Sequence, residues 1–369
     1  MILTTLALAG VAALAPDQPA FALRAARVHV GDGTVLENAI VLIEGGRITD
    51  VGKGIAVGKD VPLLDHDGDL SAGLVALRDY SGAGAEAADS TRAVMAEADL
   101  AYAFDPGHSD MARLVQAGVT TVVLSPRSGS NLVGGMPAVV KPGARVLKAK
   151  GSLHVDLSAS GASSNRYPTS IAGQIEELEH QLAEAKGTMA EVAAGRMSVM
   201  LEAETRAEIQ RALAFAGRHG LRGYLVGARR AGELAPTVKA SGFGVALGPY
   251  GPGEDKKHIA SAVALAEAGV PLGFALDGPQ RAPLTLRLGA ALCVRAGMDR
   301  DAAFLALTSG GAALAGVGDR VGAVRAGLDA DLVLWSGDPI DPTSRVMAVY
   351  IDGEKVHEAP EEDDEEDDE

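Results

Sequence analysis

The stretch SAGLVALRDYSG, residues Ser71 to Gly82, opens with apolar residues and closes with charged and aromatic ones. The run from Leu74 to Leu77 is apolar without alternation, which is typical of a parallel strand covered on both faces. Arg78 and Tyr80 follow two residues apart, so their side chains leave the strand on the same side. We therefore expect an inner strand whose carboxyl end presents a guanidinium and a phenol together.

The chain after this stretch alternates between strand-like and helical patterns. Strand-like runs such as VTTVVLSP, SVMLEAE, RGYLVGA, FGVALGP and PLGFALDG are separated by helical segments such as TRAEIQRALAFAGRHG. Roughly seven or eight such units over about 250 residues are the size expected of a (β/α)8 TIM-like barrel. A doubly wound open sheet is the alternative, but no glycine-rich dinucleotide fingerprint follows the first strand.

One glycine-rich run, SGSNLVGG from Ser128 to Gly135, suggests a phosphate-binding loop at first sight. It lacks the GxxxxGK[ST] spacing that such a loop needs to surround a phosphate. We therefore expect this run to be a loop over the barrel mouth.

The two ends of the chain have a different pattern from the middle. Residues 23–70 contain short alternating apolar runs between glycine-rich turns, and residues 320–358 repeat this pattern. Such runs are typical of small antiparallel sheets. We expect the two segments to form one composite β-sandwich domain, with the barrel over residues 71–319.

The outermost segments predict features outside these domains. Residues 1–22 begin with an uncharged apolar run that is too short to span a membrane and suits a signal peptide, and Ala20-Phe21-Ala22 offers a cleavage site. This pattern predicts export to the periplasm or the cell exterior; the alternative is a cytoplasmic protein with an apolar segment packed on its body. Residues 359–369 include EEDDEEDDE, which supplies −9 of the net charge of −16 and predicts a disordered tail.

Composition limits the partners. The 369 residues are 47% hydrophobic, enough for a substantial core, and no basic cluster with interleaved aromatics occurs. We expect no nucleic-acid partner and no membrane span, and the sequence leaves open a small-molecule partner, a protein partner or a homo-oligomer. The single cysteine, Cys293, lies in an apolar run, which excludes an intrachain disulfide and disfavours a thiolate metal site.

The order of small sheet, barrel and small sheet resembles the amidohydrolase superfamily, especially its imidazolonepropionase-like branch. Three segments carry the resemblance: ARVHVGDGTVLENAIVLIEGGRITDVG, AGVTTVVLSPRSGSNLVGGMPAVVK and GDRVGAVRAGLDADLVLWSGDP. The last is the most specific, although Leu328 stands where that family usually has a lysine. The resemblance extends from Leu23 to Lys355 and implies a hydrolase of carbon–nitrogen bonds that uses a divalent metal such as zinc.

The residues expected to bind this metal are replaced. In that family two histidines end the first barrel strand, whereas Arg78 and Tyr80 stand at these positions here. A guanidinium keeps its proton and cannot act as a metal ligand. Asp277 matches the family's catalytic aspartate, and Glu202 stands where the family commonly has a histidine. His154 could also reach the barrel mouth, so any remaining metal set would be Asp277, Glu202 and His154.

Closure of the barrel predicts which of these residues lie next to each other. The last strand of a closed barrel pairs with the first, so Asp277 should lie near Arg78. We interpret Arg78 as the replacement for the cation, paired with Asp277 and Glu202, so that no cofactor is needed and the protein is catalytically degenerate. Two alternatives remain: an atypical hydrolase of a cyclic amide, an acyl-amino acid or a dipeptide, and a module that binds a small anion through Arg78, Arg127 and Tyr80.

Overall fold

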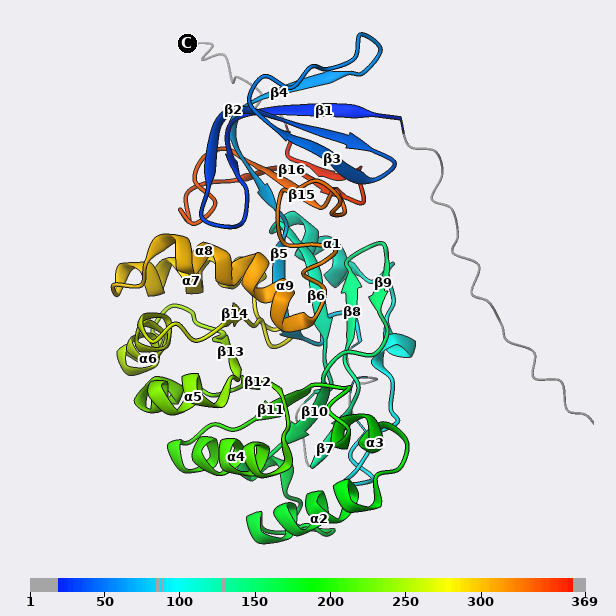
Figure 1. Cartoon of the computed structure of the whole chain (residues 1–369), viewed down its shortest axis with the longest axis vertical. Helices are drawn as coiled ribbons and strands as arrows, with labels where there is room; N and C mark the ends of the chain where they lie inside the picture. Colours follow the sequence, from blue (N-terminus) through cyan, green and yellow to red (C-terminus); the bar gives the residue numbers. More distant parts are fainter. Residues whose placement is uncertain (1–18, 84–86, 88, 128–130, 361–369) are drawn as a thin grey trace, which may run out of the picture.

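The computed structural model describes residues 19–83, 87, 89–127 and 131–360, and its two parts are a sheet domain and a curled α/β barrel (Figure 1). This confirms the fold class expected from the sequence. The predicted acidic run and all but the end of the predicted signal peptide lie outside the described residues. Within the described part of the chain, no helix combines the length and the apolar character needed to cross a membrane.

Both ends of the chain build the seven-stranded sheet, in the order β17-β16-β15-β4-β1-β2-β3. Its strands are β1 (Phe21–His29), β2 (Val35–Glu44), β3 (Arg47–Gly52), β4 (Leu63–Ala72), β15 (Leu332–Trp335), β16 (Val346–Ile351) and β17 (Glu354–Glu358). The two ends meet where β15 pairs antiparallel with β4. Leu23, Val41, Leu70 and Leu332 are buried together in the core of this domain, as the alternating apolar pattern requires.

Seven parallel strands form most of the barrel wall within the described residues. They are β5 (Leu74–Asp79), β6 (Val119–Leu124), β10 (Leu153–Asp156), β11 (Val199–Glu202), β12 (Gly223–Val226), β13 (Gly244–Leu247) and β14 (Leu272–Phe274). The last strand, β14, pairs with the first, β5. The carboxyl ends of the parallel strands therefore meet around one opening, which we call the barrel mouth.

Antiparallel strands extend the wall beside β10 and beside β6. They are β7 (Val133–Gly135), β8 (Ala138–Lys141) and β9 (Arg145–Lys148). β7 pairs with β10 and β8 pairs with β6, both antiparallel. The prediction of a mouth loop was therefore wrong for Val133–Gly135, because this backbone pairs with His154 and Val155 in the wall.

Helices cover the outside of the barrel, and Figure 1 shows α4 to α8 along one side of it. The α-helices are α1 (Ser109–Gln116), α2 (Ile171–Glu184), α3 (Gly187–Ala193), α4 (Arg206–His219), α5 (Ala235–Ser241), α6 (Lys256–Glu267), α7 (Thr285–Arg295), α8 (Arg300–Leu307) and α9 (Ser309–Ala315). Short 3-10 helices are η2 (Leu100–Ala103), η3 (Ala159–Gly161) and η4 (Ala231–Leu234). In α4, Ile209, Leu213 and Ala216 recur at helical spacing and are buried against the barrel.

Candidate functional site

A cavity of about 330 Å³ opens at the barrel mouth. Its lining includes the charged and polar side chains Arg78, Tyr80, Arg127, Ser160, Glu202, Glu204, Arg229 and Asp277. Of the six residues singled out in the sequence, Arg78, Tyr80, Arg127, Glu202 and Asp277 line this cavity, and His154 does not. The residues come from the ends of several different strands, which is where barrels of this kind carry their ligand sites.

Arg78 lies at the centre of the charged groups. Its Nη2 is 3.1 Å from Oε1 of Glu202 and 3.4 Å from Oδ1 of Asp277. The Arg78 side chain is only 10% exposed, whereas that of Asp277 is 34% exposed. Burial alone would lower the pKa of Arg78, but the charges of Glu202, Asp277 and Asp156 outweigh it and raise that pKa. The guanidinium therefore stays protonated between the two carboxylates.

The neighbouring Asp79 holds the loop that carries Asp277. Its Oδ1 accepts hydrogen bonds from the backbone N–H of Gly278 at 2.7 Å and of Tyr80 at 2.9 Å. Asp277 itself adopts a left-handed backbone conformation with φ 70°, and its N–H donates to the carbonyl of Arg78. Burial raises the pKa of Asp79. Asp79 thus fixes the ends of β5 and β14 against each other, which sets the position of Asp277 relative to Arg78.

Two buried residues of β10, His154 and Asp156, lie close to Glu202 and do not line the cavity. His154 Nε2 is 3.0 Å from Oε2 of Glu202, and the histidine is buried. Asp156 is also buried; its carboxylate accepts hydrogen bonds from the Ser158 and Ser160 hydroxyls at 2.6 and 2.8 Å. Burial raises the pKa of Asp156, and the charge of Glu202 raises it further. Sequence analysis missed Asp156 because β10 has only four residues; an aspartate two positions after His154 in an apolar run was the available signal.

Two charged residues that line the cavity have no ion-pair partner among the residues that the structure describes. Arg127 lies with its guanidinium carbon 6.0 Å from the centre of the Tyr80 ring. Glu204, which follows β11, lines the cavity beside Glu202. Neither Arg127 nor Glu204 forms a side-chain ion pair with any other residue that the structure describes, whereas Arg229 pairs with Glu254 at 3.0 Å. Among the described residues that line the mouth, Arg127 and Glu204 therefore remain available to a ligand.

These residues do not fit a divalent metal. Within the described ranges, no group of three or more His, Cys, Asp or Glu side chains is arranged to hold a metal ion. Glu202 and Asp277 already share the Arg78 guanidinium, which has no lone pair to donate to a metal. A dication placed between Glu202 and Asp277 would also meet a permanent positive charge.

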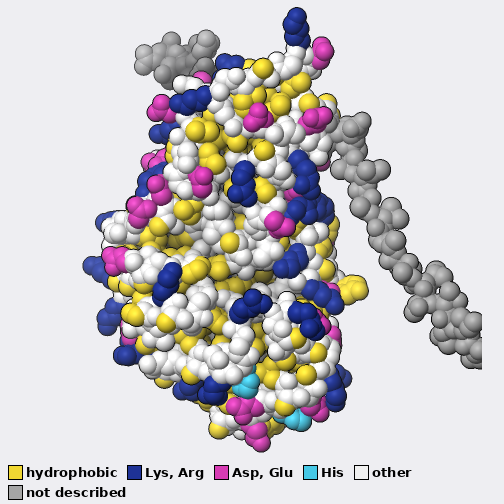
Figure 2. Space-filling view, viewed as in Figure 1, with side chains coloured by type: hydrophobic (Ala, Val, Ile, Leu, Met, Phe, Trp, Pro, Cys, Tyr) yellow, Lys and Arg dark blue, Asp and Glu magenta, His cyan; other side chains and the backbone are white. Residues whose placement is uncertain are grey.

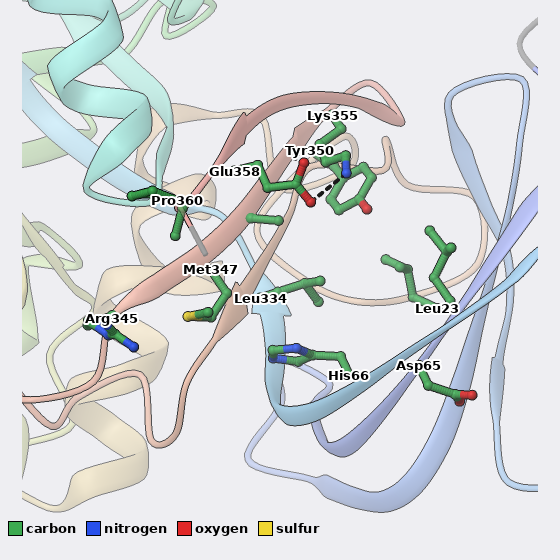
Figure 3. A pocket seen from close by; sticks show the side chains of 13 residues that line it. Leu23, Asp65, His66, Leu334, Arg345, Met347, Tyr350, Lys355, Glu358 and Pro360 are labelled. Atoms are coloured by element: carbon green, nitrogen blue, oxygen red, sulfur yellow. Dashed lines mark hydrogen bonds and ion pairs between the residues drawn. The ribbon is translucent and has the colours of Figure 1, made fainter. Parts of the chain in front are cut away.

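A larger groove, of about 610 Å³, lies on the sheet domain (Figure 3). Its polar side chains are largely paired: Lys355 with Glu358 at 2.7 Å, and His66 Nε2 with the Trp335 carbonyl at 2.8 Å. Over the face shown in Figure 2, basic and acidic side chains are intermingled. The groove contains none of the strand-end residues of the barrel, so the smaller mouth cavity is the candidate site.

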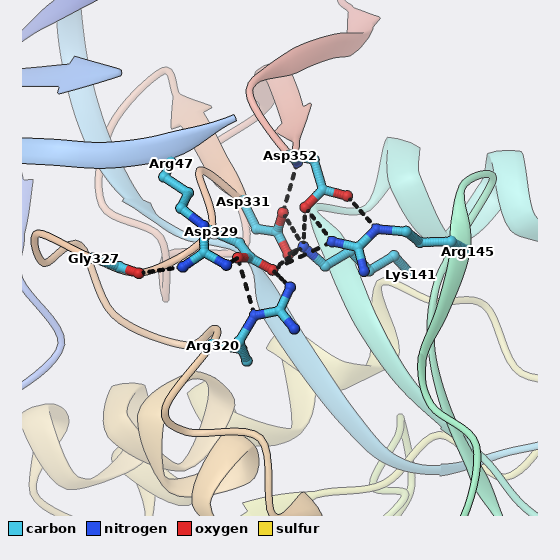
Figure 4. A network of polar contacts seen from close by, with 8 residues as sticks. All are labelled: Arg47, Lys141, Arg145, Arg320, Gly327, Asp329, Asp331 and Asp352. Atoms are coloured by element: carbon cyan, nitrogen blue, oxygen red, sulfur yellow. Dashed lines mark hydrogen bonds and ion pairs between the residues drawn. The ribbon is translucent and has the colours of Figure 1, made fainter. Parts of the chain in front are cut away.

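A second cluster of buried charges joins the barrel to the sheet domain (Figure 4). Lys141 ends β8 and is fully buried; its Nζ donates to Asp329, Asp331 and Asp352 at 2.9, 2.9 and 2.6 Å. Arg145 also binds Asp352, at 2.8 Å. We call Lys141 and its three aspartates the joint cluster. Sequence analysis did not identify these contacts.

Known proteins resemble this chain in sequence and in fold. The model of the amidohydrolase family matches residues 99–356, more than half of the chain. Over 57 residues the chain is 39% identical to amidohydrolase tasK of Hapsidospora irregularis, a stretch that makes up 15% of this chain and only 6% of that protein.

Two solved structures share the fold over most of this chain. The amidohydrolase from Thermotoga maritima MSB8 has a TM-score of 0.82 and 21% identity, covering 92% of this chain and all of its own. An adenosine deaminase from Xanthomonas campestris with bound zinc has a TM-score of 0.58 and 17% identity, covering 92% of this chain and 93% of its own. At these identities the structures establish the fold alone, and the family match adds the assignment: the chain belongs to the amidohydrolase family.

Proposed function

We propose that this protein is a catalytically degenerate amidohydrolase whose barrel mouth binds a small molecule without metal-dependent hydrolysis. The observation that carries the proposal is the position of Arg78, with Nη2 3.1 Å from Glu202 and 3.4 Å from Asp277. The guanidinium supplies the positive charge that two facing carboxylates need, and it does so without a metal.

Hydrolysis by the family's usual route needs an activated water. A bound metal lowers the pKa of its water from about 15.7 to about 7, which makes hydroxide available at neutral pH. Arg78 offers no coordination site for that water, and Oδ1 of Asp277 faces the guanidinium. His154 does not replace these functions, because it is buried behind Glu202 and does not line the cavity. This placement disfavours the alternative of an atypical hydrolase built on Glu202, Asp277 and His154.

Metal analysis of the purified protein tests the proposal. We expect no stoichiometric zinc or manganese after expression in metal-supplemented medium. The double substitution Arg78→His and Tyr80→His should raise metal content, since it restores two imidazoles on one side of β5 next to Glu202 and Asp277. Arg230→His, on an exposed residue outside the cavity, is the matched control and should not change metal content. Stoichiometric zinc or manganese in the unmodified protein, with turnover of an amide, would overturn the proposal.

A further inference from the structure

The charges that line the barrel mouth fall into two groups. One group is already neutralised: Arg78 faces Glu202 and Asp277, and Arg229 faces Glu254. The other group is Arg127 and Glu204, which have no ion-pair partner among the described residues. A simple anion would gain from Arg127 alone, and it would lie in a cavity whose other free charge is negative.

The cation and the anion lie in different parts of the cavity. Arg127 follows β6 and lies by the ring of Tyr80. Glu204 follows β11 and lies with Glu202 around Gly227: a Cβ added to this glycine would be 3.8 Å from Cγ of Glu204 and 3.7 Å from Cγ of Glu202. Since Gly227 has no side chain, the space next to these two carboxylates is open to a ligand. Arg127 and Glu204 are both exposed residues, so a ligand in the cavity can reach either charge.

We propose that the barrel mouth binds a small zwitterion, with the ligand's carboxylate at Arg127 beside Tyr80 and its ammonium group at Glu204. This inference rests on the proposed function, because a mouth without a metal leaves charge pairing as the means of recognition. A cavity of about 330 Å³ suits a compound of amino-acid or dipeptide size. Charge-assisted hydrogen bonds at both ends would fix the ligand's direction.

A ladder of ω-amino acids from glycine to 6-aminohexanoate tests the inference by calorimetry and thermal shift on metal-free protein. Alkanoates and alkylamines of the same lengths serve as single-charge probes. We expect at least one ω-amino acid to bind and to raise the melting temperature, since a ligand of the folded state stabilises it. The alkanoate and the alkylamine of the same length should bind about tenfold or more weakly, because each lacks one charged contact.

Variants assign the two ends of the ligand. Arg127→Gln and Glu204→Gln should each weaken binding about tenfold or more, and Arg127→Lys, which keeps the charge, should weaken it less. Arg230→Gln and Glu233→Gln form a matched exposed pair outside the cavity and should leave binding unchanged. Equal binding of an alkanoate and its ω-amino acid, or no binding by any member of the ladder, would overturn the inference. The proposed function would survive that result, since it depends on metal content and turnover.

Discussion

The mouth of the barrel and the joint between the domains both contain a buried cation among carboxylates, but their surroundings differ. Lys141 is 0% exposed, and among its three aspartate partners Asp329 and Asp331 are 2% exposed and Asp352 is 27% exposed. Arg78 is 10% exposed and its partner Asp277 is 34% exposed beside a cavity of about 330 Å³. Both regions therefore combine a buried cation with one partly exposed carboxylate, but in the mouth the cation and that carboxylate both line a cavity. A cation that is fully buried with two buried partners indicates a structural role, and a partly exposed carboxylate that lines a cavity indicates a ligand site.

Removing the joint cation should give the largest effect. Lys141→Met leaves three aspartates close together without their shared partner, and breaking a buried pair in this way costs about 3–5 kcal/mol. Urea unfolding near neutral pH measures the loss. Lys355→Met is the control, because Lys355 forms a surface pair with Glu358 and should lose less than about 1 kcal/mol. Equal losses in the two variants would remove the distinction between the joint and the surface.

Removing the mouth cation should cost less. We expect Arg78→Met to lower the free energy of unfolding by about 2–3 kcal/mol, below the usual range for a buried pair. Water can hydrate the partly exposed Asp277, and Glu202 keeps its contact with His154 Nε2 at 3.0 Å. The measurement is the same urea titration, with Arg113→Met, an exposed residue of α1, as control. A loss larger than that of Lys141→Met would reverse the proposed difference between the two regions.

The joint should also show a particular pH dependence. Burial raises the pKa of Asp331 from 3.8 to about 6. Protonation of this carboxyl group therefore contributes its full stabilisation of the fold below pH 3.8, and this contribution to the free energy of unfolding is lost as the pH rises through 6. Asp331→Asn removes the ionisable group, so the free energy of unfolding should depend less on pH between 3.8 and about 6.

Asp329 gives the opposite sign and serves as the comparison. Burial opposes its ionisation, but hydrogen bonds and charges from Arg320 and Lys141 outweigh burial and lower its pKa. Its contribution is present above pH 3.8 and is lost as the pH falls through the lowered value. Asp329→Asn should therefore change the profile mainly below pH 3.8. Identical profiles for the two variants would contradict these assignments.

The sequence predicted the centre of the mouth because general rules of the fold apply to it. Arg78 and Asp277 are 199 positions apart, yet each ends a recognisable apolar strand, and barrel closure makes the first and last strands neighbours. Glu202 followed from the same strand pattern. The proximity of Arg78 to both carboxylates could thus be expected from the sequence.

The sequence did not reveal the joint cluster or the antiparallel part of the wall. Lys141 meets residues 188 to 211 positions away, and no local pattern encodes which aspartates converge on a lysine. The strands β7, β8 and β10 have only three or four residues each, too few to show a period. Their structure depends on pairing with distant strands, and tertiary contacts of this kind decide where short apolar runs lie.

The joint cluster has a consequence for the order of events during biosynthesis. Lys141 is translated long before Asp329, Asp331 and Asp352, which belong to the last part of the chain. Strand β4 likewise waits for β15 to pair with its free edge. A nascent chain halted after the last barrel helix would leave one edge of β4 unpaired, which is a hazard for aggregation. The joint cluster can therefore form only after residues 329–352 have been synthesised, so this late segment completes the contact between the barrel and the sheet domain.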